Sequence, residues 1–221
     1  MSDRVLIVMD EAFEMSAISA ALKLHGVNVV GEAGKRASAI TLQRSLQPNV
    51  LLIDMHLTNE HSIAIAKEIR KVNPTIGVVM LVPCADLRLL GELHTEIPVG
   101  TKVVLKKSIN NIAALCDVIS QSRLQEQDSP VMWVNGNLAL SGKASEILMS
   151  KLTNIQIETL RHVADGLTNA EISRIRFVSE KSVEQIVSRI TQVLDIQPDP
   201  NRNMRVQLVA EYFKWIGAPR H

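Results

Sequence analysis

The chain has 221 residues, of which 46% are hydrophobic and 21% charged, and its formal net charge is +1 at pH 7. This length suffices for two domains that each bury a core, and the composition excludes a fibrous or disordered chain. No apolar run approaches the roughly 20 residues that a membrane span needs, and the N-terminus lacks the long apolar segment of a signal peptide. We therefore expect a cytoplasmic protein with no membrane partner.

Two further classes of function lack the residues they would need. The two cysteines, Cys84 and Cys116, are far apart and have no metal-ligand spacing, so neither a disulfide framework nor a zinc site is expected. The sequence shows no nucleophile paired with a base and no phosphate-binding loop, so it does not predict an enzyme. From residue 151 onward, ten Lys and Arg stand against eight Asp and Glu, which is only a slight basic bias.

The first 122 residues alternate short β-branched runs with amphipathic stretches. The runs, which read as strands buried on both faces, are 5–8, 27–31, 50–53, 77–82 and 102–105. The stretches between them carry apolar residues at helical spacing and cover roughly 12–24, 36–46, 61–71, 85–94 and 110–122. Five βα units in a row predict an α/β domain with a doubly wound parallel sheet.

Ligand sites in such sheets lie beyond the carboxyl ends of the strands. The residues at or just after those ends include Asp10, Asp54, Val82 and Lys106. Two carboxylates could bind a divalent cation there, and the lysine could counter a phosphoryl group. The alternative is that these are solvated loop residues, and the spacing alone leaves both readings open.

The C-terminal part, residues 151–217, follows a linker at 123–150 that contains an Asn-Gly turn signal. Thr153 to Gln156 forms a capping box at the start of a first helix, and Thr168 begins a second, short helix. Ser179 caps a third helix that runs to about Leu194, and a fourth covers about 203–216. A short helix, a tight turn and a longer helix make a helix-turn-helix, so we expect an all-α domain of four helices.

The third helix has an apolar stripe that must face the core, formed by Val183, Val187, Ile190 and Leu194. Its opposite side and flanks are polar and comprise Lys181, Ser182, Glu184, Gln185, Ser188, Arg189 and Gln192. A polar outer face is typical of any surface helix, so this pattern alone does not indicate DNA binding.

The fourth helix carries two apolar stripes. One consists of Val206, Val209, Phe213 and Ile216, and the other of Met204, Leu208, Tyr212 and Trp215. One stripe can pack on the domain, while the other needs a partner. We assign the second stripe to the contact of a homodimer.

Two sets of motifs resemble a known family. RVLIVMDE, VVGEAG, QPNVLLIDMHL and VVLKKS resemble the receiver domain of NarL/FixJ (LuxR-type) response regulators, and the 45-residue segment that begins at Leu152 resembles the LuxR-type DNA-binding domain. The resemblance implies a two-component regulator of transcription that binds double-stranded DNA.

The resemblance also implies roles for individual residues. Asp54 would be the phosphoacceptor and Lys106 the lysine that pairs with the phosphoryl oxygens. The ligands of Mg²⁺ would be Asp10, Glu11, Asp54 and the backbone carbonyl of His56, with Glu11 standing in for the acid that Met9 replaces. The third helix would enter the major groove, and the DNA-binding residues would be Thr168, Asn169, Ser179, Lys181, Ser182, Glu184, Gln185, Ser188 and Arg189.

Several positions depart from the receiver pattern, and they cluster at the chemistry. Val82 replaces a hydroxyl residue, Val103 replaces an aromatic one, and Thr58 and Ser62 replace a proline and a glycine. We therefore expect an atypical receiver that is phosphorylated weakly or works without phosphorylation.

Two alternatives remain. One is an ordinary regulator activated by a histidine kinase at Asp54. The other is a protein-interaction adaptor with weakened DNA binding, which Glu184 and the low basic charge would allow.

Overall fold

The computed structural model describes residues 3–57, 61–92, 94–109, 111–123, 129–134 and 151–217. The chain forms two compact units. The N-terminal unit consists of Met1–Pro83 and His94–Leu138, and the C-terminal unit of Cys84–Leu93 and Ala139–His221. The segment Cys84–Leu93 thus lies in the C-terminal unit, although the sequence-based boundary assigns it to the first domain. Thr58 and the expected Asn-Gly turn of the linker lie outside the described residues.

The N-terminal unit is built on a parallel sheet with the strand order β2-β1-β3-β4-β5-β6. The strands are β1 (Arg4–Val8), β2 (Asn28–Ala33), β3 (Val50–Asp54), β4 (Gly77–Val82), β5 (Thr101–Leu105) and β6 (Met132–Val134). The five predicted strands are confirmed. The sixth was not predicted, because a strand of three residues inside a polar linker has too short an apolar run to be recognised.

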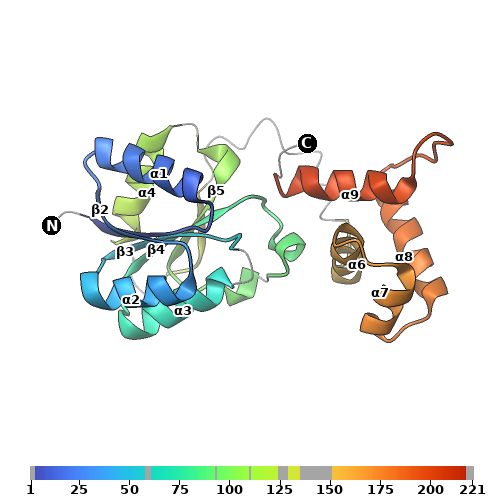
Figure 1. Cartoon of the computed structure of the whole chain (residues 1–221), viewed down its shortest axis with the longest axis horizontal. Helices are drawn as coiled ribbons and strands as arrows, with labels where there is room; N and C mark the ends of the chain where they lie inside the picture. The colour runs from blue at the N-terminus through green and yellow to red at the C-terminus, as the bar shows by residue number, and fades with distance from the viewer. Residues whose placement is uncertain are drawn as a thin grey trace. The chain divides into compact units, whose positions relative to one another are not determined.

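Helices cover both faces of this sheet. Figure 1 shows α1 (Ala12–Leu24) and α4 (Ile112–Ser122) on one face, and α2 (Arg36–Leu46) and α3 (Ser62–Val72) on the other. The central strands are buried along their whole length, as the apolar runs predict for a sheet covered on both sides. The predicted doubly wound α/β fold is confirmed.

The helix predicted at 85–94 is wrong. The structure has two short 3₁₀ helices between β4 and β5, η1 (Leu87–Leu90) and η2 (His94–Glu96). The side chain of Asp86 accepts a hydrogen bond from the backbone N–H of Arg88 and caps η1. Gly91 ends it with a φ of 81°, a left-handed conformation that favours glycine. Only four residues remain between cap and stop, too few for a stable α-helix.

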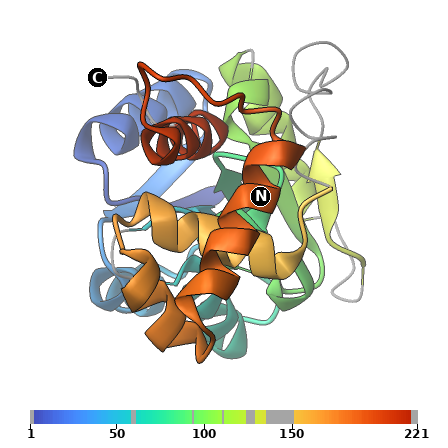
Figure 2. The same ribbon diagram turned by 90° about the vertical axis from the view of Figure 1, so that its right-hand side faces the viewer.

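The C-terminal unit contains the helices α6 (Asn154–Ala164), α7 (Asn169–Arg176), α8 (Glu180–Val193) and α9 (Met204–Trp215). The N-caps Thr153, Thr168 and Ser179 stand where the sequence predicted them. Thr153 and Gln156 form the reciprocal capping box. In Figures 1 and 2, α8 lies beside α6 and α7, and the helix-turn-helix is confirmed.

The core of this unit corrects one detail of the second helix. Ile172, Val183 and Ile190 are fully buried. Ile175, three residues after Ile172 and so on the same side of the short helix, is expected to face inward as well, but it is 45% exposed. Arg176 takes the inner position instead. It donates a hydrogen bond of 2.7 Å to Oγ1 of Thr159, which satisfies the partly buried guanidinium.

In the part of the chain that the structure describes, no helix is long and apolar enough to span a bilayer.

Candidate functional site

Asp54 and Lys106 meet at the carboxyl edge of the sheet. Asp54 is the last residue of β3, and Lys106 directly follows β5, on the other side of β4. Nζ of Lys106 lies 2.6 Å from Oδ2 of Asp54, whose side chain is only 4% exposed. Oδ1 of Asp54 accepts a second hydrogen bond of 3.2 Å from the backbone N–H of His56. The strand order therefore brings together the phosphoacceptor and lysine that the sequence suggested.

Glu14 completes this cluster and was missed by the sequence analysis. It lies in the first turn of α1, and its two carboxylate oxygens are 2.9 and 3.0 Å from Nζ of Lys106. Burial alone would lower the pKa of Lys106, but the charges and hydrogen bonds of Asp54 and Glu14 outweigh burial and raise that pKa. The ammonium group stays protonated and bridges two carboxylates.

One of the expected magnesium ligands, Glu11, has another role in the structure. Glu11 is the N-cap of α1, where its carboxylate accepts hydrogen bonds from the backbone N–H groups of Phe13 and Glu14 at 3.4 and 2.7 Å. Within the described ranges, no three His, Cys, Asp or Glu side chains form a group that could hold a metal ion.

The assignment of Asp10, Glu11, Asp54 and His56 to Mg²⁺ therefore stays a prediction. In this structure the helix N-terminus engages Glu11, while Lys106 engages Asp54. Met9, at the place of the missing acid, is fully buried in the core of the sheet.

Val82 and Val103, the two valines that replace a hydroxyl and an aromatic residue of the receiver pattern, are inaccessible to solvent. Val82 ends β4, Val103 lies in β5, and both are fully buried. Ser62 is buried as well, and its hydroxyl donates to the backbone carbonyls of Asp54 and Met55 at 2.6 and 3.1 Å. These bonds hold the end of β3 against the start of α3, so Ser62 has a structural role.

The outer face of α8 is exposed among the described residues of its unit. Lys181, Glu184, Gln185, Ser188 and Arg189 are exposed. The residues of the opposite stripe are buried or packed against the core, as the sequence predicted. Five polar or charged side chains therefore project from the longest helix of the helix-turn-helix.

The other predicted DNA-binding residues make hydrogen bonds inside the unit. Thr168 caps α7, and Ser179 caps α8 while its hydroxyl also lies 2.8 Å from that of Ser182. Oδ1 of Asn169 accepts a hydrogen bond of 2.9 Å from Nη1 of Arg205, which connects α7 to α9. These residues position the helix-turn-helix, and only the side of each that is not bonded could meet DNA.

The predicted dimer surface needs correction. Leu208 is fully buried and Tyr212 is 9% exposed, and both belong to the core of the C-terminal unit. Trp215 packs against that core, and Met204 is partly buried. The stripe that packs on the domain is thus the one we assigned to the dimer. Exposed apolar side chains occur on the other stripe, at Val206 (64%) and Phe213 (41%).

Comparison with known families agrees with both halves of this description. A family model of the response regulator receiver domain matches residues 5–119, which is more than half of the chain. A second family model, that of bacterial regulatory proteins of the luxR family, matches residues 150–200.

Individual proteins are similar to this chain over most of its length. The response regulator protein VraR of Staphylococcus epidermidis is 27% identical over 199 residues, which cover 89% of this chain and 92% of VraR. The probable transcriptional regulatory protein TcrX of Mycobacterium tuberculosis is 26% identical over 168 residues, 71% of this chain and 68% of TcrX.

The fold is shared with solved structures of RcsB. That of Salmonella enterica serovar Typhimurium RcsB bound to the promoter P1flhDC has a TM-score of 0.55 at 20% identity, over 97% of this chain and 100% of RcsB. A structure of two RcsB dimers bound to two parallel DNAs has a TM-score of 0.54 at 19% identity, over 96% and 99%. With its receiver fold, its helix-turn-helix and both family matches, the chain belongs to the response regulators that carry a LuxR-type DNA-binding domain.

Proposed function

We propose that this protein is a cytoplasmic transcription regulator that binds double-stranded DNA as a homodimer and does not depend on phosphorylation of Asp54. The independence from phosphorylation rests on the cluster of charged side chains at the carboxyl edge of the sheet. Lys106 is held between Asp54 and Glu14, so the phosphoacceptor is already neutralised by an internal cation.

The DNA-binding part rests on α8 and on the solved relatives. The exposed face of α8 presents Lys181 and Arg189, which can reach phosphates, and Gln185, which can pair with adenine. RcsB, which shares the fold, has been solved on promoter DNA and as dimers on DNA. A regulator rather than an enzyme fits this surface and these relatives.

The apolar side chains of Val82 and Val103 support independence from phosphorylation. For phosphorylation of Asp54 to change the conformation of the receiver, nearby side chains would have to donate hydrogen bonds to the phosphoryl oxygens. Val82 has no hydroxyl to offer, and Val103 has no aromatic ring that could change its packing. The lysine that could pair with the phosphoryl oxygens is held by a second carboxylate, Glu14.

Replacing Asp54 with asparagine should therefore leave the Kd for DNA within about twofold of the wild-type value, well below the roughly 1.4 kcal/mol of a tenfold change. A small-molecule phosphodonor with Mg²⁺ should modify Asp54 only weakly. Fluorescence anisotropy with the full-length protein measures the Kd, and intact-mass spectrometry measures the phosphoryl adduct.

Glu14→Gln is the informative companion variant, because it releases Lys106 from its second carboxylate and leaves Asp54 intact. If that variant accepts the phosphoryl group and the wild type does not, Glu14 accounts for the weak phosphorylation. A stable phosphoryl adduct on the wild type that raises DNA affinity tenfold would contradict the proposal and favour an ordinary regulator driven by a histidine kinase.

The homodimer should form through the exposed stripe of α9. Val206→Glu together with Phe213→Glu should give monomers in sedimentation velocity and weaken binding to paired half-sites, because two carboxylates would be buried in the isologous contact. Each side chain is exposed in the single chain, so the fold should remain intact by circular dichroism. Unchanged sedimentation of the double variant would place the interface elsewhere.

A further inference from the structure

The segment between β4 and β5 leaves the receiver and becomes part of the DNA-binding unit. We call residues 84–92 the strap. They include η1, and they belong to the compact unit that also contains α6, α7, α8 and α9. The N-terminal unit resumes at His94 with η2 and β5. The chain therefore passes from one unit to the other at both ends of the strap as well as in the linker.

Apolar side chains anchor the strap in the core. Cys84 is 4% exposed and Leu89 is 1% exposed, and both belong to the same buried cluster as Leu152, Leu160 and Tyr212. The hydrophobic core of the helix-turn-helix unit is thus completed by residues that precede the linker.

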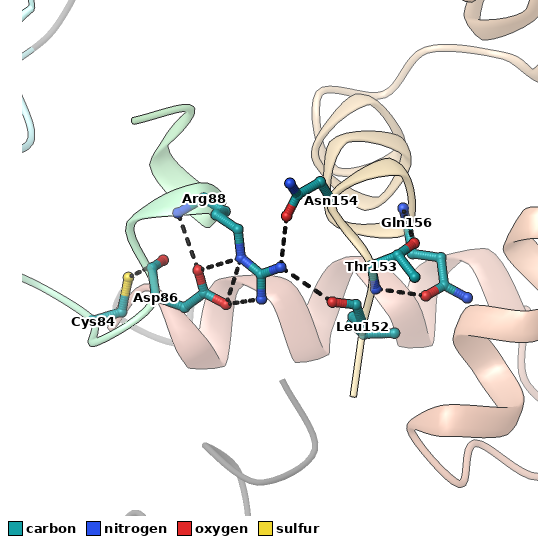
Figure 3. Close-up of polar contacts among 7 residues, drawn as sticks. All are labelled: Cys84, Asp86, Arg88, Leu152, Thr153, Asn154 and Gln156. Carbon is teal, nitrogen blue, oxygen red and sulfur yellow. Dashed lines mark hydrogen bonds and ion pairs between the residues drawn. The ribbon is translucent and has the colours of Figure 1, made fainter. Parts of the chain in front are cut away.

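Arg88 anchors the strap at the beginning of α6. Figure 3 shows its guanidinium group held by the carboxylate of Asp86 and directed at the residues on either side of Thr153. Nη1 of Arg88 donates to the carbonyl of Leu152 at 3.2 Å and to Oδ1 of Asn154 at 2.8 Å. Thr153 is the N-cap of α6, so Arg88 holds the backbone carbonyl of the residue before that cap and the side chain of the residue after it.

Two further contacts hold the strap against α9 and α6. The hydroxyl of Tyr212 donates a buried hydrogen bond of 2.8 Å to the carbonyl of Leu89. Burial raises the pKa of Tyr212, so this donor keeps its proton. The guanidinium of Arg161 lies directly against Gly91, so a side chain at that position would displace it.

The strap follows directly after β4, and the carboxyl end of β4 is hydrogen-bonded to the strand ends next to Asp54 and Lys106. Asp54 pairs with Leu81 between β3 and β4, and Val82 pairs with Leu105 between β4 and β5, directly before Lys106. Only Pro83 separates Val82 from the strap, and its ring restricts the backbone there. The chain between the carboxyl end of β4 and the first anchored residue, Cys84, is therefore too short to absorb a shift of β4.

We propose that the strap is a mechanical coupling element: it carries a change in the position of the carboxyl end of β4 to the N-terminus of α6 and so to DNA affinity. This inference rests on the proposed DNA-binding function. The perturbation it transmits is any event that removes or displaces Lys106 from its place between Asp54 and Glu14; Asp54→Asn is not such an event, because Glu14 still holds Lys106. Coupling between sites in such systems commonly amounts to a factor of about 5 or more.

The first test asks whether the strap fixes α6. In the full-length protein, Arg88→Ala should make the amides of the first turn of α6 exchange with solvent roughly tenfold faster, since charge-assisted hydrogen bonds at the cap are lost. Arg88→Lys keeps the charge but not the two-pronged geometry and should give an intermediate rate. Tyr212→Phe removes only one hydroxyl and should loosen the strap itself. Arg36→Ala is the matched control, because Arg36 bonds the carboxylate of Glu68 in the other unit.

The second test is a double-mutant cycle on coupling. Lys106→Ala rearranges the ion cluster and should alter both amide exchange in the strap and α6 and the Kd for DNA. In the Arg88→Ala background, Lys106→Ala should lose most of that effect, giving a non-additivity of about fivefold or more in Kd.

The exchange measurement needs no DNA, so it remains decisive if DNA binding itself is absent. Strictly additive effects of the two substitutions, or α6 exchange that ignores Lys106→Ala while responding to Arg88→Ala, would overturn the coupling and leave the strap as a structural part alone. Wild-type exchange rates in Arg88→Ala, Arg88→Lys and Tyr212→Phe would overturn the anchoring as well.

Discussion

Replacing Lys106 with alanine is expected to lower the free energy of unfolding of the N-terminal unit by about 2–4 kcal/mol. The substitution leaves the carboxylate of Asp54, whose side chain is 4% exposed, without its ammonium partner and beside the charge of Glu14. The lower part of the range accounts for the 25% exposure of Lys106, which lets water solvate the cluster in part. Urea unfolding of the full-length protein, followed by circular dichroism, measures the change.

A second substitution separates the charge effect from lost packing. Asp54→Asn in the Lys106→Ala background should recover most of the stability, because it removes the uncompensated charge. Lys23→Ala is the matched control: Lys23 pairs with Glu32 at 3.2 Å with 53% of its side chain exposed, so its loss should cost no more than about 1 kcal/mol. Equal losses from Lys106→Ala and Lys23→Ala would show that the buried pair carries no special energy.

The pH dependence of the Lys106→Ala variant has a defined sign. Burial is the largest influence on the pKa of Asp54 and raises it. Between the ordinary pKa of an aspartate and this raised pKa, the folded state holds a proton that the unfolded state has released. The charge and hydrogen bond of Lys106 lower the pKa of Asp54 in the wild type, so their loss raises this pKa further in the variant. The stability of the variant should therefore rise relative to wild type as the pH falls from the raised pKa towards the ordinary one, and the difference should be constant above the raised pKa. A difference that stays constant with pH would assign the loss to packing.

Local signals in the sequence were enough to predict most of the fold. The apolar runs that became β1 to β5 are continuous because both faces of the sheet are covered, and that pattern is visible without any tertiary information. The starts of α6, α7 and α8 were predicted because a capping side chain bonds a backbone N–H group two or three residues away.

The strap could not be predicted because its packing decides its conformation. Asp86 to Gly91 has leucines at helical spacing, yet the cap and the stop lie so close together that only η1 forms. Which core receives Leu89 depends on contacts with residues more than 60 positions away, such as Leu152 and Tyr212. Periodicity contains no information about such contacts.

The candidate site was predicted in part for the same reason. Strand ends converge by topology, so Asp54 and Lys106 could be paired from the sequence. Glu14 approaches Lys106 from a helix 92 residues away, and only the placement of α1 on the sheet decides that. We assigned the inward and outward faces of α9 the wrong way round because both of its stripes are apolar. The pattern alone cannot tell which stripe packs on the domain.

The exposed face of α8 should determine DNA affinity in two separable ways. Lys181 and Arg189 are exposed cations on this face, so each that reaches a phosphate should contribute about one unit to the slope of log K against log salt concentration. The double variant Lys181→Ala/Arg189→Ala should lose about two units of slope and roughly 100-fold in affinity, if each contact is worth about 1.4 kcal/mol. Gln185→Ala should instead change which sequences are preferred, because an amide reads base edges.

A charge-matched control removes the same two residue types from the N-terminal unit. Lys23→Ala/Arg36→Ala deletes side chains that are 53% and 56% exposed and pair with Glu32 and Glu68, so it lowers the net charge equally without touching α8. Titrations at several salt concentrations, with specific and random duplexes, should leave its slope close to the wild-type value. If both double variants lose the same slope, the effect is one of net charge and α8 is not the contact surface.

Glu184 decides between the regulator and the adaptor. Its carboxylate is exposed on the same face as Lys181 and Arg189 and repels phosphates, although it can accept a hydrogen bond from cytosine N4. In a DNA-binding regulator, Glu184→Lys should raise affinity for random duplexes while reducing discrimination between sequences, because a base-reading acceptor is exchanged for a phosphate-binding cation. A wild-type protein without salt-dependent binding that gains it only through Glu184→Lys would instead identify α8 as a surface for a protein partner.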